Sequence, residues 1–247
     1  MIKTILFILL FSCLGFSQCG YFDGVNDGYD SENSGGGFNG LSDATAMFWF
    51  KQDLNGTAVF VDAGAGSGNR NIYIEVKWGA PGPYWNVYWK VSGGGLSQLQ
   101  HNIPAANYYL GSWHHFAVTY HANTSSQRMF IDGEEVSTVG TKTGNDILNT
   151  IAGAVFFGWD GSTSYIEGQF DDIKFFKILL SQAQIQSEMF NNDYCYTDDC
   201  ITFFDFTFPV YGNLAVFPDK SPRNEFYTRV NADYASYKED NCPTTGK

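Results

Sequence analysis

Residues 111–120 (GSWHHFAVTY) and 129–136 (MFIDGEEV) contain the pattern that decides the fold of this chain. Aromatic and β-branched side chains fill both runs, and such residues favour β-strands. The segment between the runs is polar and has nothing to bury, so it predicts the connection between two paired strands. Within the second run, Asp132-Gly133 predicts a tight turn, because glycine adopts positive φ at little cost.

The composition is that of one large β domain. The chain has 247 residues, of which 44% are hydrophobic and 17% aromatic, enough to bury a full core. Short apolar runs alternate with clusters of Gly, Asn, Asp and Ser, which predicts an antiparallel sandwich. The expected strands are residues 46–51, 58–62, 72–78, 85–91, 113–120, 128–131, 154–158 and 168–176. One short helix is expected from Ser181 to Met189, with Ser181 as its N-cap.

The first 17 residues have the layout of a secretory signal peptide. An early lysine precedes an apolar run from Ile5 to Leu14, and small residues follow at Gly15 and Ser17. We expect cleavage after Ser17 or Gln18 and an extracellular or cell-surface location. No transmembrane segment is expected, because the apolar run is shorter than the roughly 20 residues that span a bilayer.

Four cysteines remain once the signal removes Cys13: Cys19, Cys195, Cys200 and Cys242. An even number of cysteines in an exported protein predicts structural disulfides. Four cysteines permit three connectivities, and the sequence leaves all three open. Their spacing matches no zinc motif, because no Cys-x-x-Cys or paired histidine accompanies them.

The charge of the chain restricts its partners. A net charge of −12 argues against nucleic acid, whose phosphates need clustered lysine and arginine. The charge is compatible with calcium, which binds carboxylate and carbonyl oxygens in extracellular loops. By itself the charge favours the simpler interpretation, a soluble acidic surface that binds no ion.

Two neighbouring strands, residues 72–78 and 85–91, alternate in character along their length. Side chains two residues apart lie on the same face of a strand. One face of the pair is predicted to be core and carries Ile72, Ile74, Val76, Trp78, Trp85, Val87, Trp89 and Val91. The opposite face carries Tyr73, Glu75 and Lys77 beside Tyr84, Asn86, Tyr88 and Lys90.

That opposite face is the candidate binding surface of the chain. Tyrosine rings beside polar groups form a surface on which a sugar ring can stack while hydrogen bonds fix its orientation. The ligand-binding candidates are Tyr73, Glu75, Tyr84, Asn86 and Tyr88. The alternative is that these side chains form ordinary cross-strand pairs on a solvated face.

His114 and His115 suggest a metal ligand or a general base, but they are neighbours on a predicted strand and so point to opposite faces. We therefore expect one histidine to be packed and the other exposed. No Gly-x-Ser-x-Gly or His-Glu-x-x-His motif accompanies them. The pair is predicted to be structural.

Four motifs together resemble a known family. They are YFDGVND (21–27), the hairpin around Trp113 to Val136, EGQFDDIKFF (167–176) and LSQAQI (180–185). In this order and spacing the chain resembles the laminin-G-like domains of secreted bacterial proteins, in the concanavalin A-like lectin/glucanase superfamily. The resemblance implies an all-β jelly-roll sandwich of two curved antiparallel sheets with one short helix. It does not fix the function, because the fold carries lectins, glucanases and adhesive modules.

The same resemblance implies a structural calcium ion where the first strand meets the last. The matching positions are Asp23, Gly24 and either Asp171 or Asp172. The alternative is that Asp23 stabilises a turn before Gly24, and that one of the adjacent aspartates accepts hydrogen bonds from nearby amides. Apart from calcium, no cofactor is expected.

No catalytic residue is expected. The glucanases of the superfamily place carboxylates in a Glu-x-Asp-x-x-Glu strand motif, which this chain lacks. Glu75 stands alone, and Asp171-Asp172 on a regular strand would point to opposite faces. The sequence therefore predicts a secreted, non-catalytic module that binds a glycan or an extracellular surface protein. The alternatives are an adhesion or structural module without a small-ligand site, and a divergent glycoside-active enzyme; the oligomeric state stays open.

The end of the chain is unusual for the family. Residues 201–208 (ITFFDFTF) and 219–224 (DKSPRN) resemble the opening strand and turn of the family, displaced to the C-terminus. We expect a signal peptide (1–17), a sandwich (18–191) and an extension (192–247) that adds a strand to the same sandwich, since about 50 residues rarely form a second core. The competing interpretation is the start of a truncated second repeat.

Overall fold

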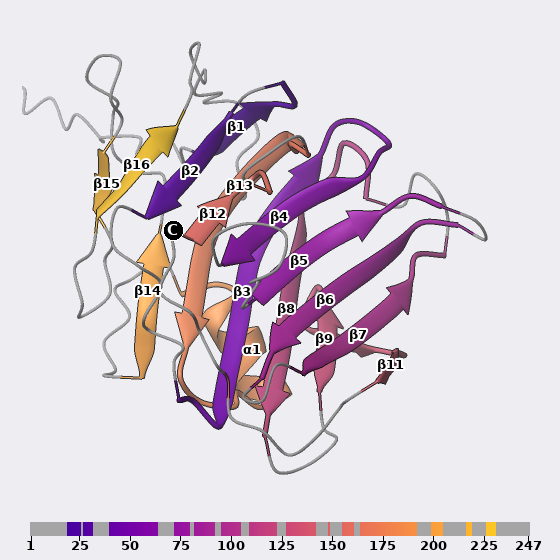
Figure 1. Cartoon of the computed structure of the whole chain (residues 1–247), viewed down its shortest axis with the longest axis vertical. Coiled ribbons are helices and arrows are strands. Elements are labelled where there is room, and N and C mark those ends of the chain that lie inside the picture. The colour runs from indigo at the N-terminus through magenta and orange to yellow at the C-terminus, as the bar shows by residue number, and fades with distance from the viewer. Residues whose placement is uncertain are drawn as a thin grey trace, which may run out of the picture.

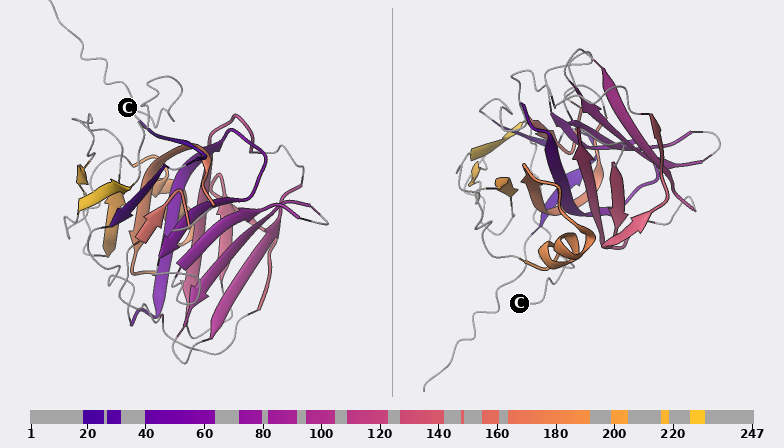
Figure 2. Two further views of the ribbon diagram at one scale, coloured as in Figure 1. Left: turned by 45° about the horizontal axis from the view of Figure 1, so that its top comes forward. Right: turned by 90° about the horizontal axis from the view of Figure 1, so that it is seen from below.

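Two antiparallel β-sheets packed face to face make up the fold, and one short helix lies outside one of them (Figures 1 and 2). The predicted all-β jelly-roll sandwich is confirmed. This computed structural model describes residues 19–25, 27–31, 40–63, 72–79, 82–91, 95–104, 109–122, 127–141, 148, 155–160, 164–191, 199–204, 216–218 and 226–230. No helix in these ranges is both long and apolar enough to cross a membrane.

The first sheet contains the two strands that were predicted at residues 113–120 and 128–131. Its hydrogen-bonded order is β1 (Gly20–Asp23), β13 (Glu167–Phe176), β3 (Asp43–Gln52), β8 (His114–His121), β9 (Arg128–Ile131) and β10 (Glu134–Val136). Strand β14 (Cys200–Phe204) also pairs with β13. Because β3 occupies one edge of β13, β1 and β14 lie end to end along its other edge.

The second sheet is the larger one among the described residues. Its order is β11 (Val139–Thr141), β7 (Leu96–Asn102), β6 (Tyr84–Lys90), β5 (Ile72–Lys77), β4 (Ala58–Ala63), β12 (Val155–Phe157), β2 (Gly28–Ser31), β16 (Phe226–Val230) and β15 (Val216–Pro218). Strand β16 pairs with β2. Segments beyond residue 192 therefore extend both sheets, β14 the first and β15–β16 the second.

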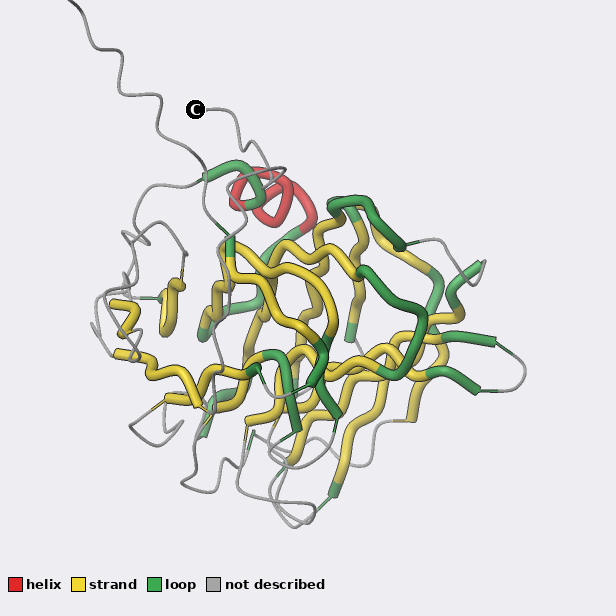
Figure 3. Tube along the Cα trace, turned by 90° about the horizontal axis from the view of Figure 1, so that it is seen from above, coloured by secondary structure: helices red, strands yellow, loops and turns green. Residues whose placement is uncertain are grey.

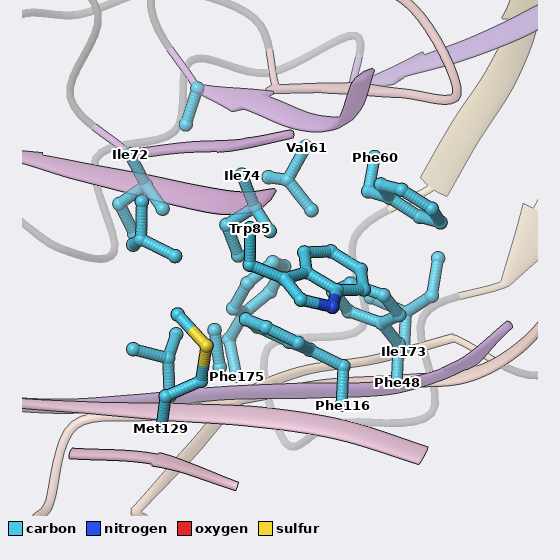
Figure 4. Packing of buried hydrophobic residues seen from close by; sticks show 14 of the residues in the cluster. Phe48, Phe60, Val61, Ile72, Ile74, Trp85, Phe116, Met129, Ile173 and Phe175 are labelled. Atoms are coloured by element: carbon cyan, nitrogen blue, oxygen red, sulfur yellow. The ribbon is translucent and has the colours of Figure 1, made fainter. Parts of the chain in front are cut away.

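The core between the sheets is dominated by aromatic rings (Figure 4). Phe48 stacks on Phe116 with ring centroids 5.1 Å apart, and Trp85 lies 4.4 Å from Phe116 across the sandwich. The predicted core face of β5 and β6 is confirmed, because seven of its eight side chains are at most 1% exposed. Trp78 is half-buried and packs against the same cluster.

The alternation of inward and outward side chains along β13 reverses at a bulge. Phe170 faces the core, the register with β3 shifts between Asp171 and Lys174, and Asp172 has a φ of 47°. After the shift Ile173 and Phe175 face the core. An extra residue in one strand reverses the alternation that follows it. The expectation that Asp171 and Asp172 alternate as on a regular strand does not hold here, and both side chains are buried.

The helix α1 (Gln182–Glu188) covers the outer face of the first sheet (Figure 3). Ser181 is its N-cap, as the sequence predicts, and it forms a capping box with Gln184. Ile185 and Met189 pack on an apolar layer of this sheet that includes Met47, Ala117 and Phe130. Since Lys174 follows the bulge, it also points to this side.

Lys174 is buried beneath the C-terminal end of α1. Its Nζ donates to the carbonyl oxygen of Glu188 at 2.8 Å and to that of Asn191, and lies 3.5 Å from the Glu188 carboxylate. Desolvation lowers the pKa of Lys174, while nearby Asp172 and Glu188 oppose this change. The lysine thus satisfies carbonyl groups that the helix end would leave without donors.

Candidate ligand-binding face

The cross-strand register of β5 and β6 brings together all five sequence-predicted ligand residues. Tyr73 pairs with Tyr88, Glu75 with Asn86, and Lys77 with Tyr84. All of these side chains lie on the outward face of the second sheet, because their neighbours along each strand are in the core. The sequence prediction of a shared face is therefore confirmed.

Strand β7 widens this face with residues that the sequence analysis missed. Gln98 pairs with Tyr88, Gln100 with Asn86, and Asn102 with Tyr84. Strand β7 was not among the expected strands, because Leu99 is the only strongly apolar residue among its inward-facing positions. The sequence signal that could have identified this strand is the polar residue at every second position, 98, 100 and 102. We call the set Tyr73, Glu75, Tyr84, Asn86, Tyr88, Gln98 and Gln100 the polar face.

Hydrogen bonds link the polar face into one network. Glu75 Oε1 accepts from Asn86 Nδ2 at 2.7 Å, and Glu75 Oε2 accepts from Tyr73 Oη at 3.2 Å. Asn86 Oδ1 accepts from Gln98 Nε2 at 2.7 Å and from Gln100 Nε2 at 3.2 Å. Gln98 Nε2 also donates to Tyr88 Oη at 3.1 Å. Such a network holds its members in one arrangement.

Burial divides the polar face into two groups. Tyr73, Glu75 and Asn86 are 3%, 6% and 1% exposed. The side chains of Tyr84, Tyr88, Gln98 and Gln100 are half-buried. A ligand would therefore reach the second group, whereas the first group supports it from beneath.

A hollow adjoins the polar face at the edge between β7 and β11. It has a volume of about 240 Å³ and is lined by Gln100, His101, Asn102, Ser137, Thr138 and Val139. His101 Nδ1 lies 2.7 Å from the carbonyl oxygen of Ser137, so this ring nitrogen carries the proton and donates it. Gln100 belongs both to the hollow and to the polar face, which makes the two surfaces continuous.

Residues 23–186 match the family model of the concanavalin A-like lectin/glucanases superfamily. The chain belongs to this superfamily. Among curated proteins, no relative with significant sequence similarity to the chain was found.

Solved structures of this architecture resemble the chain at low sequence identity. A candidate carbohydrate-binding protein from Bacteroides ovatus has a TM-score of 0.62 and 15% identity. The match covers 90% of this chain and 59% of the Bacteroides protein. A heptameric SAP-like pentraxin from Limulus polyphemus has a TM-score of 0.53 and 12% identity, with 70% and 81% covered. At such identities the likeness shows the fold alone.

The calcium positions suggested by the superfamily resemblance are separated along β13. Asp23 lies opposite Glu167 in the β1–β13 register, whereas Asp171 lies beyond Phe170 at the other end of that ladder. Asp23 Oδ1 accepts from the Val25 amide at 2.8 Å, and Asp171 Oδ1 accepts from the Asp172 amide at 2.9 Å. Within the described ranges no group of three or more His, Cys, Asp or Glu side chains could hold a metal. Calcium stays a prediction of the resemblance.

The two histidines point to opposite sides of β8, as the sequence predicts. His115 is 1% exposed and lies against Trp49, with ring centroids 5.2 Å apart. Burial, assisted by the nearby Lys174 charge, lowers the pKa of His115 to about 3. His114 is half-buried rather than exposed as expected, because its ring packs beside Phe50 with ring centroids 6.1 Å apart. Its Nδ1 lies 2.8 Å from Asp132 Oδ2.

Asp132 joins these histidines to the tight turn. Asp132 and Gly133 have φ values of 53° and 78°, which confirms the turn predicted between β9 and β10. Asp132 Oδ1 also accepts from the His115 amide at 2.8 Å. Desolvation acts to raise the pKa of Asp132, but hydrogen bonds from His114 and His115 outweigh it and lower the pKa. These contacts hold a turn together and agree with the structural role predicted for the pair.

Cys19 and Cys200 are both buried and both disulfide-bonded. They lie at the starts of β1 and β14, the two strands that share one edge of β13. Cys195 and Cys242 lie outside the described residues, as does the predicted signal peptide. The connectivity of the four cysteines stays open.

Proposed function

We propose that this protein is a secreted, non-catalytic module that binds carbohydrate through the polar face of its second sheet. One observation carries the proposal: half-buried Tyr84 and Tyr88 stand beside half-buried Gln98 and Gln100 on one face. Tyrosine rings supply apolar contact for a sugar ring, and amides supply hydrogen bonds for its hydroxyl groups. Membership of a lectin-containing superfamily and the carbohydrate-binding name of the Bacteroides neighbour support it.

The environment of the carboxylates supports a non-catalytic role. Both oxygens of Glu75 already accept hydrogen bonds, from Asn86 and Tyr73. Asp62, the carboxylate that lies opposite Tyr73 on β4, is buried as well. Retaining glycoside hydrolysis needs two carboxylates about 5–5.5 Å apart, one of them free to attack the sugar. Glu75 is engaged in holding Asn86 instead.

Tyr84→Ala and Tyr88→Ala test this function on a glycan array. We expect each change to weaken binding about tenfold, because each removes a ring that stacks on the ligand, worth about 1–1.5 kcal/mol. Tyr21→Ala is the matched control, since Tyr21 is a half-buried tyrosine on β1 of the first sheet and should leave binding unchanged.

Two results would contradict the proposal. Equal binding by the wild type and both face variants would move the site elsewhere. Release of reducing sugars from a bound oligosaccharide would show an enzyme and remove the non-catalytic assignment.

A further inference from the structure

The buried carboxylate of Glu75 fixes which way the amides of the polar face point. A carboxylate only accepts hydrogen bonds, so Asn86 turns its Nδ2 group toward Glu75 Oε1, 2.7 Å away. Asn86 Oδ1 then points away from Glu75 and accepts from both glutamines, at 2.7 Å from Gln98 and 3.2 Å from Gln100. The orientation of three amides thus follows from one acid.

The accessible atoms of the network include two carbonyl acceptors. Gln98 and Gln100 both direct their Nε2 groups toward Asn86 Oδ1. Their Oε1 oxygens therefore face away from Asn86. Among the described residues, neither Oε1 oxygen has a hydrogen-bond partner. Tyr88 Oη accepts from Gln98, and its own proton remains for donation. The face therefore offers two carbonyl acceptors, and its donors are the second Gln100 Nε2 hydrogen and the hydroxyl groups of Tyr84 and Tyr88.

The charges around these atoms do not attract an anion. The described ionisable side chains on the outward positions of β4 to β7, tyrosines apart, are Asp62, Glu75, Lys77 and Lys90, two of each sign. Lys77 is exposed at the end of β5, and the other three are buried. The whole chain carries a net charge of −12, which repels polyanions. A sulfate or a carboxylate accepts only, so it cannot bind the Gln98 and Gln100 Oε1 oxygens, whereas a sugar hydroxyl can.

We infer that the polar face selects neutral saccharides, whose hydroxyl groups donate to Gln98 Oε1 and Gln100 Oε1. In this assignment Glu75 is a positioning residue that orients the amides without contacting the ligand. The inference rests on the proposed function, since it names the class of carbohydrate bound at the same site. The adjoining hollow at Gln100 and Asn102 gives room for a further sugar unit.

The test measures binding by the full chain to two sets of probes. One set contains neutral pentasaccharides of glucose, mannose and xylose, and the other contains oligogalacturonate and sulfated heparin-type oligosaccharides. We expect binding of a neutral probe, changing less than about twofold between about 0.05 and 0.5 M NaCl, because no ion pair contributes. The double change Gln98→Ala/Gln100→Ala should weaken it at least about tenfold.

Glu75→Gln tests the positioning role. A glutamine here can donate to Asn86 Oδ1, which lets the three amides reverse and present donors to the ligand. We expect at least about tenfold weaker binding of the neutral probe, with a gain for the acidic probes relative to it. A purely structural role would not change this preference. Glu134→Gln, which removes the same charge from exposed Glu134 on β10, should leave both affinities unchanged.

The outcomes separate the inference from the function on which it rests. Preferred, salt-sensitive binding of the acidic probes would overturn the neutral assignment and leave carbohydrate binding intact. Neutral binding that survives the Gln98/Gln100 change would overturn the assignment of these acceptors. Binding of no saccharide in either set would reject both the inference and the proposed function. If Glu75→Gln does not fold, the glutamine variants decide, because both side chains are half-buried.

Discussion

At the scale of single residues, burial decides the role of each polar side chain more than its type does. Glu75 and Asn86 have the chemistry of ligand-binding groups, but burial makes them a support for Gln98 and Gln100. His114 and His115 are adjacent, yet only His115 is removed from water. The role of a polar side chain therefore depends on how deeply the fold buries it.

His115 should make stability depend on pH. Its pKa is about 3 in the folded chain and about 6.5 when unfolded, so below pH 6.5 only the unfolded state binds the proton. The free energy of unfolding should then fall by up to about 1.4 kcal/mol per pH unit as pH falls toward 3. Urea unfolding between pH 7 and pH 4 should show a shallower slope for His115→Asn than for the wild type.

A matched variant controls for the other groups that titrate in this range. Tyr21→Phe removes a hydroxyl whose pKa lies above 10, because of burial and nearby carboxylates, and it should keep the wild-type slope. Equal slopes for His115→Asn and the wild type would show that His115 does not cause the dependence.

At the scale of elements, the short helix depends on the sheet beneath it. A helix of seven residues is too short to be stable alone, and α1 is fixed by its cap, by Ile185 and by Lys174. The Trp49 indole adds a bond from Nε1 to the Met189 carbonyl oxygen at 3.0 Å. The bulge in β13 is what turns Lys174 toward the helix.

Lys174→Met should destabilise the protein by about 2 kcal/mol, because it removes charge-assisted hydrogen bonds to the Glu188 and Asn191 carbonyls. Urea unfolding measures the loss, and hydrogen exchange should accelerate in residues 182–189. Lys177→Met is the control, since Lys177 is exposed and three residues away on the chain. Equal stability of both variants would show that the buried amine does not hold the helix.

At the scale of the whole molecule, segments far apart in sequence complete the two sheets. Strand β13 is bordered by β1 from the start of the chain and by β14 from its last quarter. Ile201 of β14 is buried in the main core. We therefore expect the free energy of unfolding to depend on residues beyond the family match, which ends at residue 186.

Ile201→Ala should lower the free energy of unfolding by about 2–4 kcal/mol, the usual result of deleting a buried aliphatic side chain. Deleting residues 192–247 should lower the melting temperature further, because it also exposes one edge of β13. Val25→Ala is the control, since Val25 is an exposed apolar residue and should cost less than about 0.5 kcal/mol. A truncated protein that melts like the full chain would place the C-terminal segment outside the cooperative unit.

The sequence alone determined the features that depend on neighbours along the chain. Alternation identified the core and outward faces of β5 and β6, Asp132-Gly133 identified the turn, and Ser181 identified the helix cap. These follow from local backbone preferences and from side-chain period. The tertiary structure alone decided what depends on distant partners: the addition of β7 with Gln98 and Gln100, the bulge at Asp172, and the burial of Glu75 beneath the face. Register, bulges and burial are set by packing between strands that only the fold brings together, so no local pattern could supply them.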